Sequence, residues 1–136
     1  MSPFERHWIL WSGLILFSLL AACADDQPPR IVDTTLVGST ANPMGPYEVT
    51  AVVTDDGSVD TVRLYYGPAT DSGLSYVSQG MTAEGADLYI GSLGSWPVGT
   101  TLYYYLEAKD DGGNRATDPP GAPDQGTYSF EVLAGE

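Results

Sequence analysis

Residues 101–109 read Thr-Leu-Tyr-Tyr-Tyr-Leu-Glu-Ala-Lys, and their alternating pattern is the clearest indication of the fold class. Every second residue from Leu102 to Ala108 is apolar or aromatic, and the residues that alternate with them, from Tyr103 to Lys109, carry polar tips. Successive side chains of an extended strand point to opposite sides of the sheet. The stretch therefore predicts a strand with one buried and one solvent-facing side.

The same alternation recurs before and after this stretch, and turn-forming sequences such as Asn42-Pro43 and Asp110-Asp111-Gly112-Gly113 separate the segments. Glycine accepts positive φ and aspartate bonds its own backbone, so these separators predict tight turns. No segment of the mature chain shows the apolar periodicity of a helix. We expect seven strands, at Ile31–Val37, Tyr47–Thr54, Asp60–Tyr66, Ser75–Gln79, Asp87–Leu93, Thr101–Lys109 and Thr127–Leu133. Strands at this spacing are typical of an all-β, antiparallel β-sandwich.

Length, charge and cysteine content exclude several classes of protein. A chain of 136 residues suits one domain. Five Lys and Arg residues against 18 Asp and Glu residues give a net charge of −13, so we expect no nucleic-acid partner. The single cysteine rules out an intrachain disulfide and a cysteine-based zinc site.

The sequence of residues 1–23 predicts a targeting signal. Residues 8–22 contain no charged side chain, and this stretch is shorter than a membrane-spanning helix needs, which is typical of a secretory signal peptide. Leu20-Ala21-Ala22-Cys23 closely resembles the lipobox of bacterial lipoproteins. In that family a diacylglycerol is attached to the cysteine and a peptidase cleaves just before it. The resemblance implies a signal peptide over residues 1–22 and a bilayer anchor on acylated Cys23.

Residues 23–29 carry two prolines and no periodicity, so they predict a short lipid-anchored tether in front of a domain over residues 30–136. Residue 24, the second of the mature chain, is Ala24 rather than aspartate. In Gram-negative lipoproteins aspartate at that position is associated with retention in the inner membrane. The resemblance therefore implies a location in the cell envelope, at the outer membrane of a Gram-negative bacterium.

A second resemblance covers the domain, and the stretches that carry it are Pro28–Ile31, Gly45–Val49, Val59–Tyr66, Gly99–Asp110, Gly113-Asn114 and Tyr128–Val132. Through them the domain resembles the Ig-like and fibronectin-type-III-like modules of bacterial secreted and surface proteins. This resemblance implies a seven-stranded antiparallel Ig-like/fibronectin-type-III-like β-sandwich. Because such modules serve as spacers, adhesins and binding modules alike, it does not single out one function.

Catalysis is difficult to build from this composition. The only histidine, His7, lies in the predicted signal peptide, and the only cysteine is the predicted lipid anchor, so the mature chain has no Ser-His or Cys-His pair. Paired carboxylates remain, and they leave a carboxylate-based hydrolase as an alternative. We expect a protein that is not an enzyme.

Acidic residues gather on two of the predicted loops, which an Ig-like sandwich places at one pole. The loop between the second and third strands and the loop between the sixth and seventh strands contribute Asp55, Asp56, Asp60, Asp110, Asp111 and Asn114. Converging carboxylates suit Ca²⁺, which prefers hard oxygen ligands. A calcium-stabilised structural spacer is therefore one alternative, and tight turns formed by Asp-Gly sequences are the simpler interpretation.

Several tyrosines fall on one face of a predicted sheet. Alternation places Arg63, Tyr65, Tyr103 and Tyr105 on the outer side of the sheet formed by the third, sixth and seventh strands. Tyrosine is favoured at recognition surfaces because it buries a large area with few torsions and keeps a polar tip. We therefore expect a non-catalytic module that recognises a protein or an envelope glycan through this face. Alternatively, the rings only stabilise the sheet, or a strand that we have not assigned covers them. Residues 113–125 show no strand pattern and predict a long loop.

Overall fold

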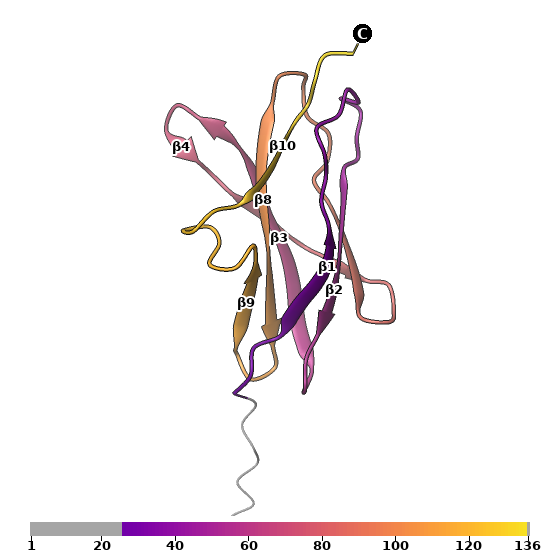
Figure 1. Ribbon diagram of the computed structural model, residues 1–136, viewed down its shortest axis with the longest axis vertical. Coiled ribbons are helices and arrows are strands. Elements are labelled where there is room, and N and C mark those ends of the chain that lie inside the picture. Colours follow the sequence, from indigo (N-terminus) through magenta and orange to yellow (C-terminus); the bar gives the residue numbers. More distant parts are fainter. Residues whose placement is uncertain (1–25, 136) are drawn as a thin grey trace, which may run out of the picture.

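Figure 1 shows the computed structural model, which describes residues 26–135. Within this range the chain is all β: it has no helix, and hence none that could span a membrane. The strands are β1 (Arg30–Thr35), β2 (Glu48–Thr54), β3 (Val59–Thr70), β4 (Gly73–Leu74), β5 (Val77–Gly80), β6 (Thr82–Ala83), β7 (Leu88–Ser92), β8 (Thr101–Asp110), β9 (Arg115–Asp118) and β10 (Tyr128–Glu131). The predicted signal peptide, Cys23 and the start of the tether lie outside the described residues.

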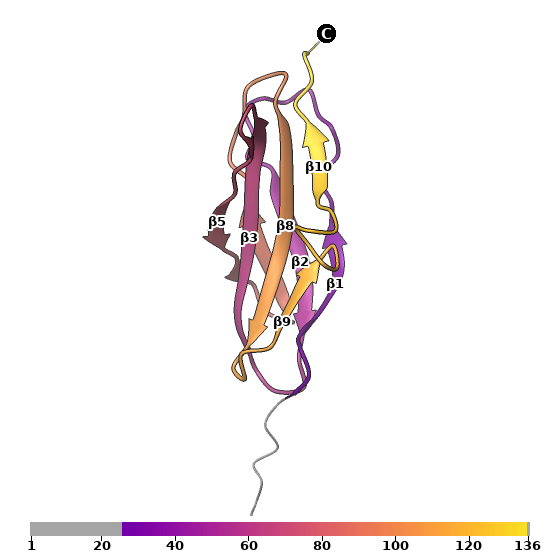
Figure 2. The same cartoon turned by 90° about the vertical axis from the view of Figure 1, so that its left-hand side faces the viewer.

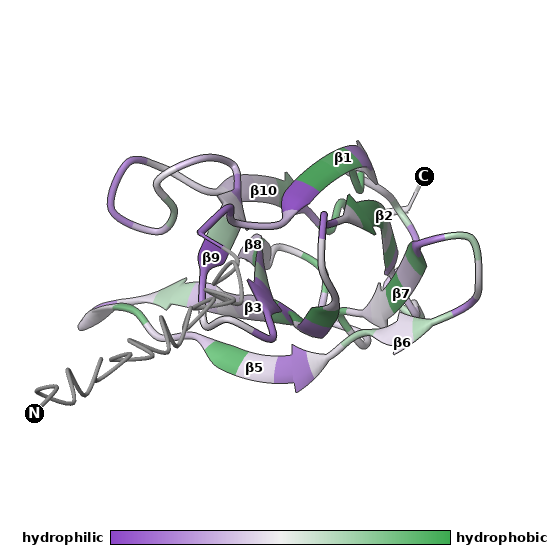
Figure 3. Cartoon of the chain, turned by 90° about the horizontal axis from the view of Figure 1, so that it is seen from below, coloured by the Kyte–Doolittle hydropathy of each residue, from purple (hydrophilic) through white to green (hydrophobic). Residues whose placement is uncertain are grey.

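The strands form two antiparallel sheets. The first sheet has the order β1-β2-β7-β6, and the second has the order β10-β8-β3-β4, in which β5 also pairs with β3 and β9 with β8. Viewed from below in Figure 3, the two sheets face each other, β1 lies near β10 along one side and β5 continues into β6 along the other. The arrangement is sandwich-like, and the predicted all-β antiparallel class is confirmed.

Alternation along the strands builds one core between the sheets. Every second residue of β2, from Val49 to Val53, is fully buried, and so are Leu102 and Leu106 of β8. Phe130 of β10 closes the same cluster. Burial of each large apolar side chain contributes about 1.5–3 kcal/mol to folding, so the inward residues predicted from the sequence supply most of the stabilisation.

The described part of the chain has ten strands rather than the seven expected, and one reason is a strand that is interrupted. Both β4 and β5 pair with β3 in the same register, so together they form one strand that is interrupted in the middle. The interruption lies opposite Gly67 and Pro68 of β3. Proline has no N–H to donate, and a Cβ atom at Gly67 would lie 2.0 Å from the carbonyl oxygen of Ser75.

A second interruption lies in the segment expected to be a loop. Within residues 113–125, strand β9 pairs with β8 and places Asp118 opposite Leu106. The chain then leaves the sheet and returns as β10, where Tyr128 pairs with Tyr104. Strand β9 ends opposite Leu106 and β10 begins opposite Tyr104, so the two strands lie end to end along the same side of β8. Residues 119–127 form the loop that leaves this side of the sheet and returns to it. The expectation that the segment contains no strand was wrong.

The edge between β1 and β9–β10, which we call the hydrogen-bonded edge, is closed by side-chain hydrogen bonds and by a short backbone bridge. Thr34 Oγ1 donates to Asp118 Oδ2 at 2.5 Å, and the Tyr128 hydroxyl donates to Asp118 Oδ1 at 2.6 Å. Burial and this bond to the carboxylate raise the pKa of Tyr128 above its ordinary value. Further along, Thr40 and Val132 form a parallel bridge. One carboxylate therefore connects the two sheets.

The opposite edge, which we call the crossover edge, is closed by backbone. The chain pairs with β3 as β5 and then with β7 as β6, so it passes from the second sheet to the first. Met81 lies at the crossing: its N–H donates to the Val62 carbonyl at 2.8 Å, and its side chain is 8% exposed. One methionine therefore fills the core at the point where the chain changes sheets.

Candidate functional site

The outer side of the second sheet brings together the four residues predicted to form a binding face. Figure 2 looks onto this sheet, in which β8 runs between β3 and the line of β9 and β10. Tyr65 pairs with Tyr105, Arg63 with Glu107 and Gly67 with Tyr103 across the two central strands. We call this side, with Arg63, Tyr65, Tyr103 and Tyr105, the tyrosine face.

Tyr105 lies beneath its neighbours on this face. The rings of Tyr65 and Tyr105 stack with centroids 4.8 Å apart and an interplanar angle of 4°. Tyr76 meets Tyr105 edge-on at 5.3 Å, and only 8% of Tyr105 is exposed. Burial, together with the neighbouring hydroxyls and the carboxylates of Glu107 and Asp124, raises the pKa of Tyr105. The expectation that Tyr105 presents an open ring was therefore wrong, because the β4–β5 connection covers it.

Sequence reasoning missed Tyr76, which belongs to this cluster. The residue lies between β4 and β5, where the chain passes close to Gly67. Its hydroxyl is buried without a hydrogen-bond partner in the part of the chain that the structure describes. A glycine inside a strand often marks the close approach of another backbone, so Gly67 was the signal in the sequence that could have located this contact.

Tyr103 and Tyr65 remain partly exposed and carry the accessible part of the face. Tyr103 lies opposite Gly67 on β3 and opposite Ser129 on β10, so neither cross-strand neighbour has a bulky side chain. Tyr65 is held in place by its stack on Tyr105. The face thus presents one ring fixed by a neighbour and one ring flanked by small residues.

Charged groups are concentrated around these rings. Of the four Lys and Arg residues between 26 and 135, three lie on the tyrosine face, and Arg30 lies on β1. Arg115 Nη1 pairs with Glu107 at 2.9 Å, and Lys109 Nζ lies 3.9 Å from the Asp60 carboxylate. Both pairs are at the surface, so each contributes at most about 1 kcal/mol to stability. They nevertheless set the local charge of the face.

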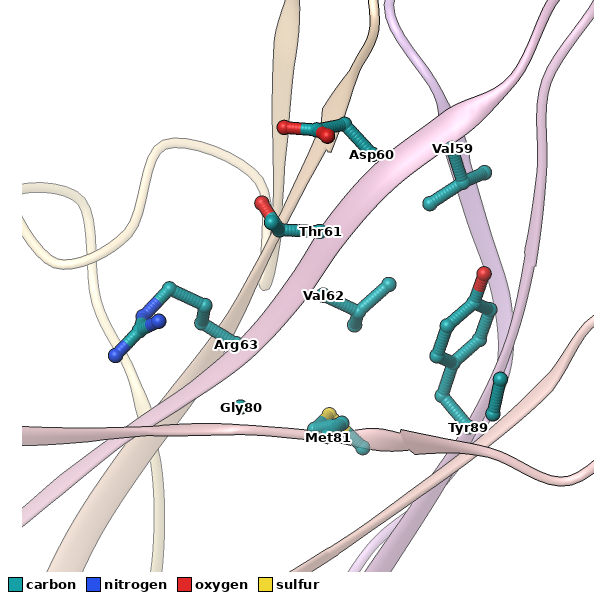
Figure 4. Close-up of a pocket in the computed structure, with 9 residues that line it drawn as sticks. Val59, Asp60, Thr61, Val62, Arg63, Gly80, Met81 and Tyr89 are labelled. Carbon is teal, nitrogen blue, oxygen red and sulfur yellow. The ribbon is translucent and has the colours of Figure 1, made fainter.

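A hollow of about 380 Å³ opens at the crossover edge, beside the tyrosine face. Its lining residues are Val59, Asp60, Thr61, Val62, Arg63, Gly80, Met81, Ala83 and Tyr89. Figure 4 shows Asp60 and Arg63 projecting from one side of β3, and Val59 and Val62 from the other. The hollow therefore has an apolar side towards the core and a charged rim towards the tyrosine face.

The two acidic loops lie at one pole, as expected, because the Asp111 N–H donates to the Ser58 carbonyl at 3.0 Å. Asp110, however, is fully buried and accepts bonds from the N–H and the side-chain amide of Asn114, both at 2.8 Å. Burial alone would raise the pKa of Asp110, but the bonds from Asn114 and from nearby backbone N–H groups outweigh it and hold that pKa below its usual value.

The remaining acids of these loops follow the same pattern. Asp55 Oδ2 accepts the N–H of Gly57 at 3.0 Å, and Asp60 lies beside Lys109, while Asp56 and Asp111 are exposed. Over residues 26–135 no three acidic, histidine or cysteine side chains are placed to hold a metal ion. These contacts favour the interpretation of the loops as tight turns.

The chain was also compared with known proteins. No protein-family model and no curated protein matches this chain, so its function is argued from the site itself.

Proposed function

We propose that this chain is a lipid-anchored protein of the bacterial cell envelope that binds a glycan without chemical turnover, through the tyrosine face. The observation that carries the proposal is the packed tyrosine cluster, in which Tyr65 stacks on Tyr105 at 4.8 Å and Tyr76 closes the other side. Rings that are already fixed lose little conformational entropy on binding. Tyr65, which this packing fixes, and Tyr103 offer accessible apolar surfaces and hydroxyl groups, which suit a sugar ring.

The fold supports a recognition module of the Ig-like/fibronectin-type-III-like type. The four-stranded sheet faces a sheet in which β8 is central, and the chain after β1 bridges to the chain after β10 in parallel. Modules of this kind carry binding surfaces on a rigid scaffold. The absence of histidine after residue 7 also argues against nucleophilic catalysis.

The anchor rests on the lipobox-like Leu20-Ala21-Ala22-Cys23 and on Ala24, which favours the outer membrane of a Gram-negative bacterium. Two or three acyl chains hold a protein stably at a bilayer, since each buried methylene contributes about 0.8 kcal/mol. Intact-mass analysis of the membrane fraction should show a chain that begins at Cys23 and carries acyl mass. A Cys23→Ser variant should be lost from that fraction, and its retention would contradict the anchor.

Binding through the face is tested by glycan capture. Full-length protein in mild detergent is passed over beads that carry polysaccharide extracted from Gram-negative envelopes. Capture should fall at least tenfold for Tyr103→Ala and for Tyr65→Ala. The matched control is Val32→Ala, at a partly exposed position on β1 of the other sheet, and it should be captured like the wild type. Equal capture of all four proteins would contradict the proposal.

A further inference from the structure

Arg63 differs from the other cations on the tyrosine face in its partner. Its Nη2 donates to the Ser78 hydroxyl at 2.9 Å, and Ser78 is the cross-strand neighbour of Tyr65. Across β8, Arg63 pairs with Glu107, but the Glu107 carboxylate bonds Arg115 at 2.9 Å. In the described part of the chain, Arg63 is thus held beside Tyr65 by a neutral group and has no ion pair.

The charges around Arg63 favour a single anionic group. Three cations, Arg63, Lys109 and Arg115, and two carboxylates, Asp60 and Glu107, sum to +1 on the Arg63 side of the face in a chain of −13, while the carboxylate of Asp124 acts on Tyr105. Charges beyond the Debye length of about 8–10 Å are largely screened. A bound carboxylate would therefore respond to this local excess, whereas a long polyanion would meet the acidic remainder of the domain.

The guanidinium also has room for a ligand. Gly80 is the partner of Arg63 on β5, and no heavy atom lies within 4 Å of the position where a Cβ atom of Gly80 would stand. Both residues line the 380 Å³ hollow. The guanidinium carries five N–H donors, and a planar fork of this kind binds a carboxylate through two parallel hydrogen bonds. One of the five donors is used by Ser78, so the others remain for a ligand.

These observations point to a more specific ligand, and the inference rests on the proposed function. We infer that the tyrosine face binds a sugar unit that carries a carboxylate, as uronic acids do, with the carboxylate on Arg63 and the sugar ring against Tyr65. Gly80 leaves the space for the carboxylate, and Ser78 orients the guanidinium. The neutral part of the glycan extends along the face towards Tyr103, the other partly exposed ring.

The experiment compares two probes that differ only in charge. Full-length protein in mild detergent is titrated by calorimetry with an otherwise neutral oligosaccharide that carries one uronic acid unit. The second probe is the same oligosaccharide after that carboxyl group has been reduced to an alcohol. Wild type should bind the acidic probe about tenfold more tightly, since hydrogen bonds to a charged group are stronger than those to a neutral one. Added salt should reduce this preference.

Variants locate the carboxylate. Arg63→Gln should bind both probes alike, and Arg63→Lys should keep part of the preference because it retains charge without the planar fork. Gly80→Leu should lower the affinity for the acidic probe at least tenfold, because the leucine side chain fills the space beside Arg63. Arg30→Gln is the matched control, since it removes the same charge from the other sheet and should bind like the wild type.

Three results would overturn the inference. If the wild type binds the two probes with equal affinity, the face does not recognise the carboxylate and the inference is wrong. The proposed function still holds in that case if glycan capture depends on Tyr103. If neither probe binds, the inference is rejected as well. If Tyr103→Ala then also leaves the capture of envelope glycan unchanged, the proposed function is rejected together with it. Preferential binding of a short peptide with a free C-terminal carboxylate over the acidic sugar would assign the subsite to peptides instead.

Discussion

The two edges of the sheet pair are closed by different chemistry. At the hydrogen-bonded edge, the Asp118 carboxylate accepts bonds from Thr34 and Tyr128 and so connects the two sheets. At the crossover edge, the backbone changes sheets at Met81 and leaves a hollow of about 380 Å³ beside Arg63. Side-chain hydrogen bonds connect the sheets at the first edge, whereas the second edge contains an open hollow.

This difference separates stability from binding. A partly buried carboxylate with two strong partners is costly to disturb, because its removal leaves the partner hydroxyls without an acceptor. A surface arginine with a neutral partner contributes little to folding and keeps its charge for a ligand. We therefore expect substitutions at the hydrogen-bonded edge to change stability, and substitutions around Arg63 to change binding.

The largest effect is expected for Asp118→Ala. The variant should lose about 3 kcal/mol of unfolding free energy in chemical denaturation, since two charge-assisted hydrogen bonds disappear. Arg63→Gln, in the same assay, should change it by less than about 0.5 kcal/mol. Comparable losses for the two variants would break the distinction between the edges.

Met81→Ala should have the next largest effect. The side chain fills the core at the crossing, and its truncation should cost about 2 kcal/mol by leaving a cavity. Met81→Leu conserves volume and should cost less than about 1.5 kcal/mol. If both variants unfold like the wild type, the crossing is not a packing point and the crossover edge is looser than described.

Alkaline pH should destabilise the hydrogen-bonded edge selectively. The folded pKa of Tyr128 is raised above its unfolded value of 10.0, so its neutral form stabilises the fold below pH 10 and that contribution is lost as the pH rises further. Between pH 8 and pH 11 the wild type should therefore lose more stability than Tyr128→Phe, by about 1 kcal/mol. Tyr104 and Tyr105 also have raised pKa values, so both proteins should decline. Parallel declines of equal size would contradict the role given to Tyr128.

The smallest effect is expected at the pole where the two acidic loops meet. Asp110 is occupied by its bonds to Asn114, so millimolar Ca²⁺ should shift the melting temperature by less than about 1 °C, because a ligand stabilises only the state that binds it. EDTA should also have no effect. A clear rise with Ca²⁺ that Asp111→Asn weakens would support a calcium-stabilised spacer instead.

How far the sequence predicts this molecule depends on the range of the contact. Alternation in residues 101–109 locates β8 and its buried side, because that signal is local. Tyr76 covers Tyr105 only because its segment returns to β3, and a local pattern does not predict this contact. The sequence Arg-Ala-Thr-Asp at residues 115–118 alternates too weakly to reveal β9 or the loop that follows it. Thr34 and Asp118 are 84 residues apart, so no local pattern connects them.

We propose that the tyrosine face binds a glycan while the rest of the domain provides the stability, and a Tyr103→Ala variant separates these two roles. Capture of envelope polysaccharide and the melting temperature are measured on the same preparation of full-length protein. We predict that capture falls at least tenfold while the melting temperature changes by less than about 3 °C. Undiminished capture, or a loss of capture that accompanies a collapse of the melting temperature, would contradict the account.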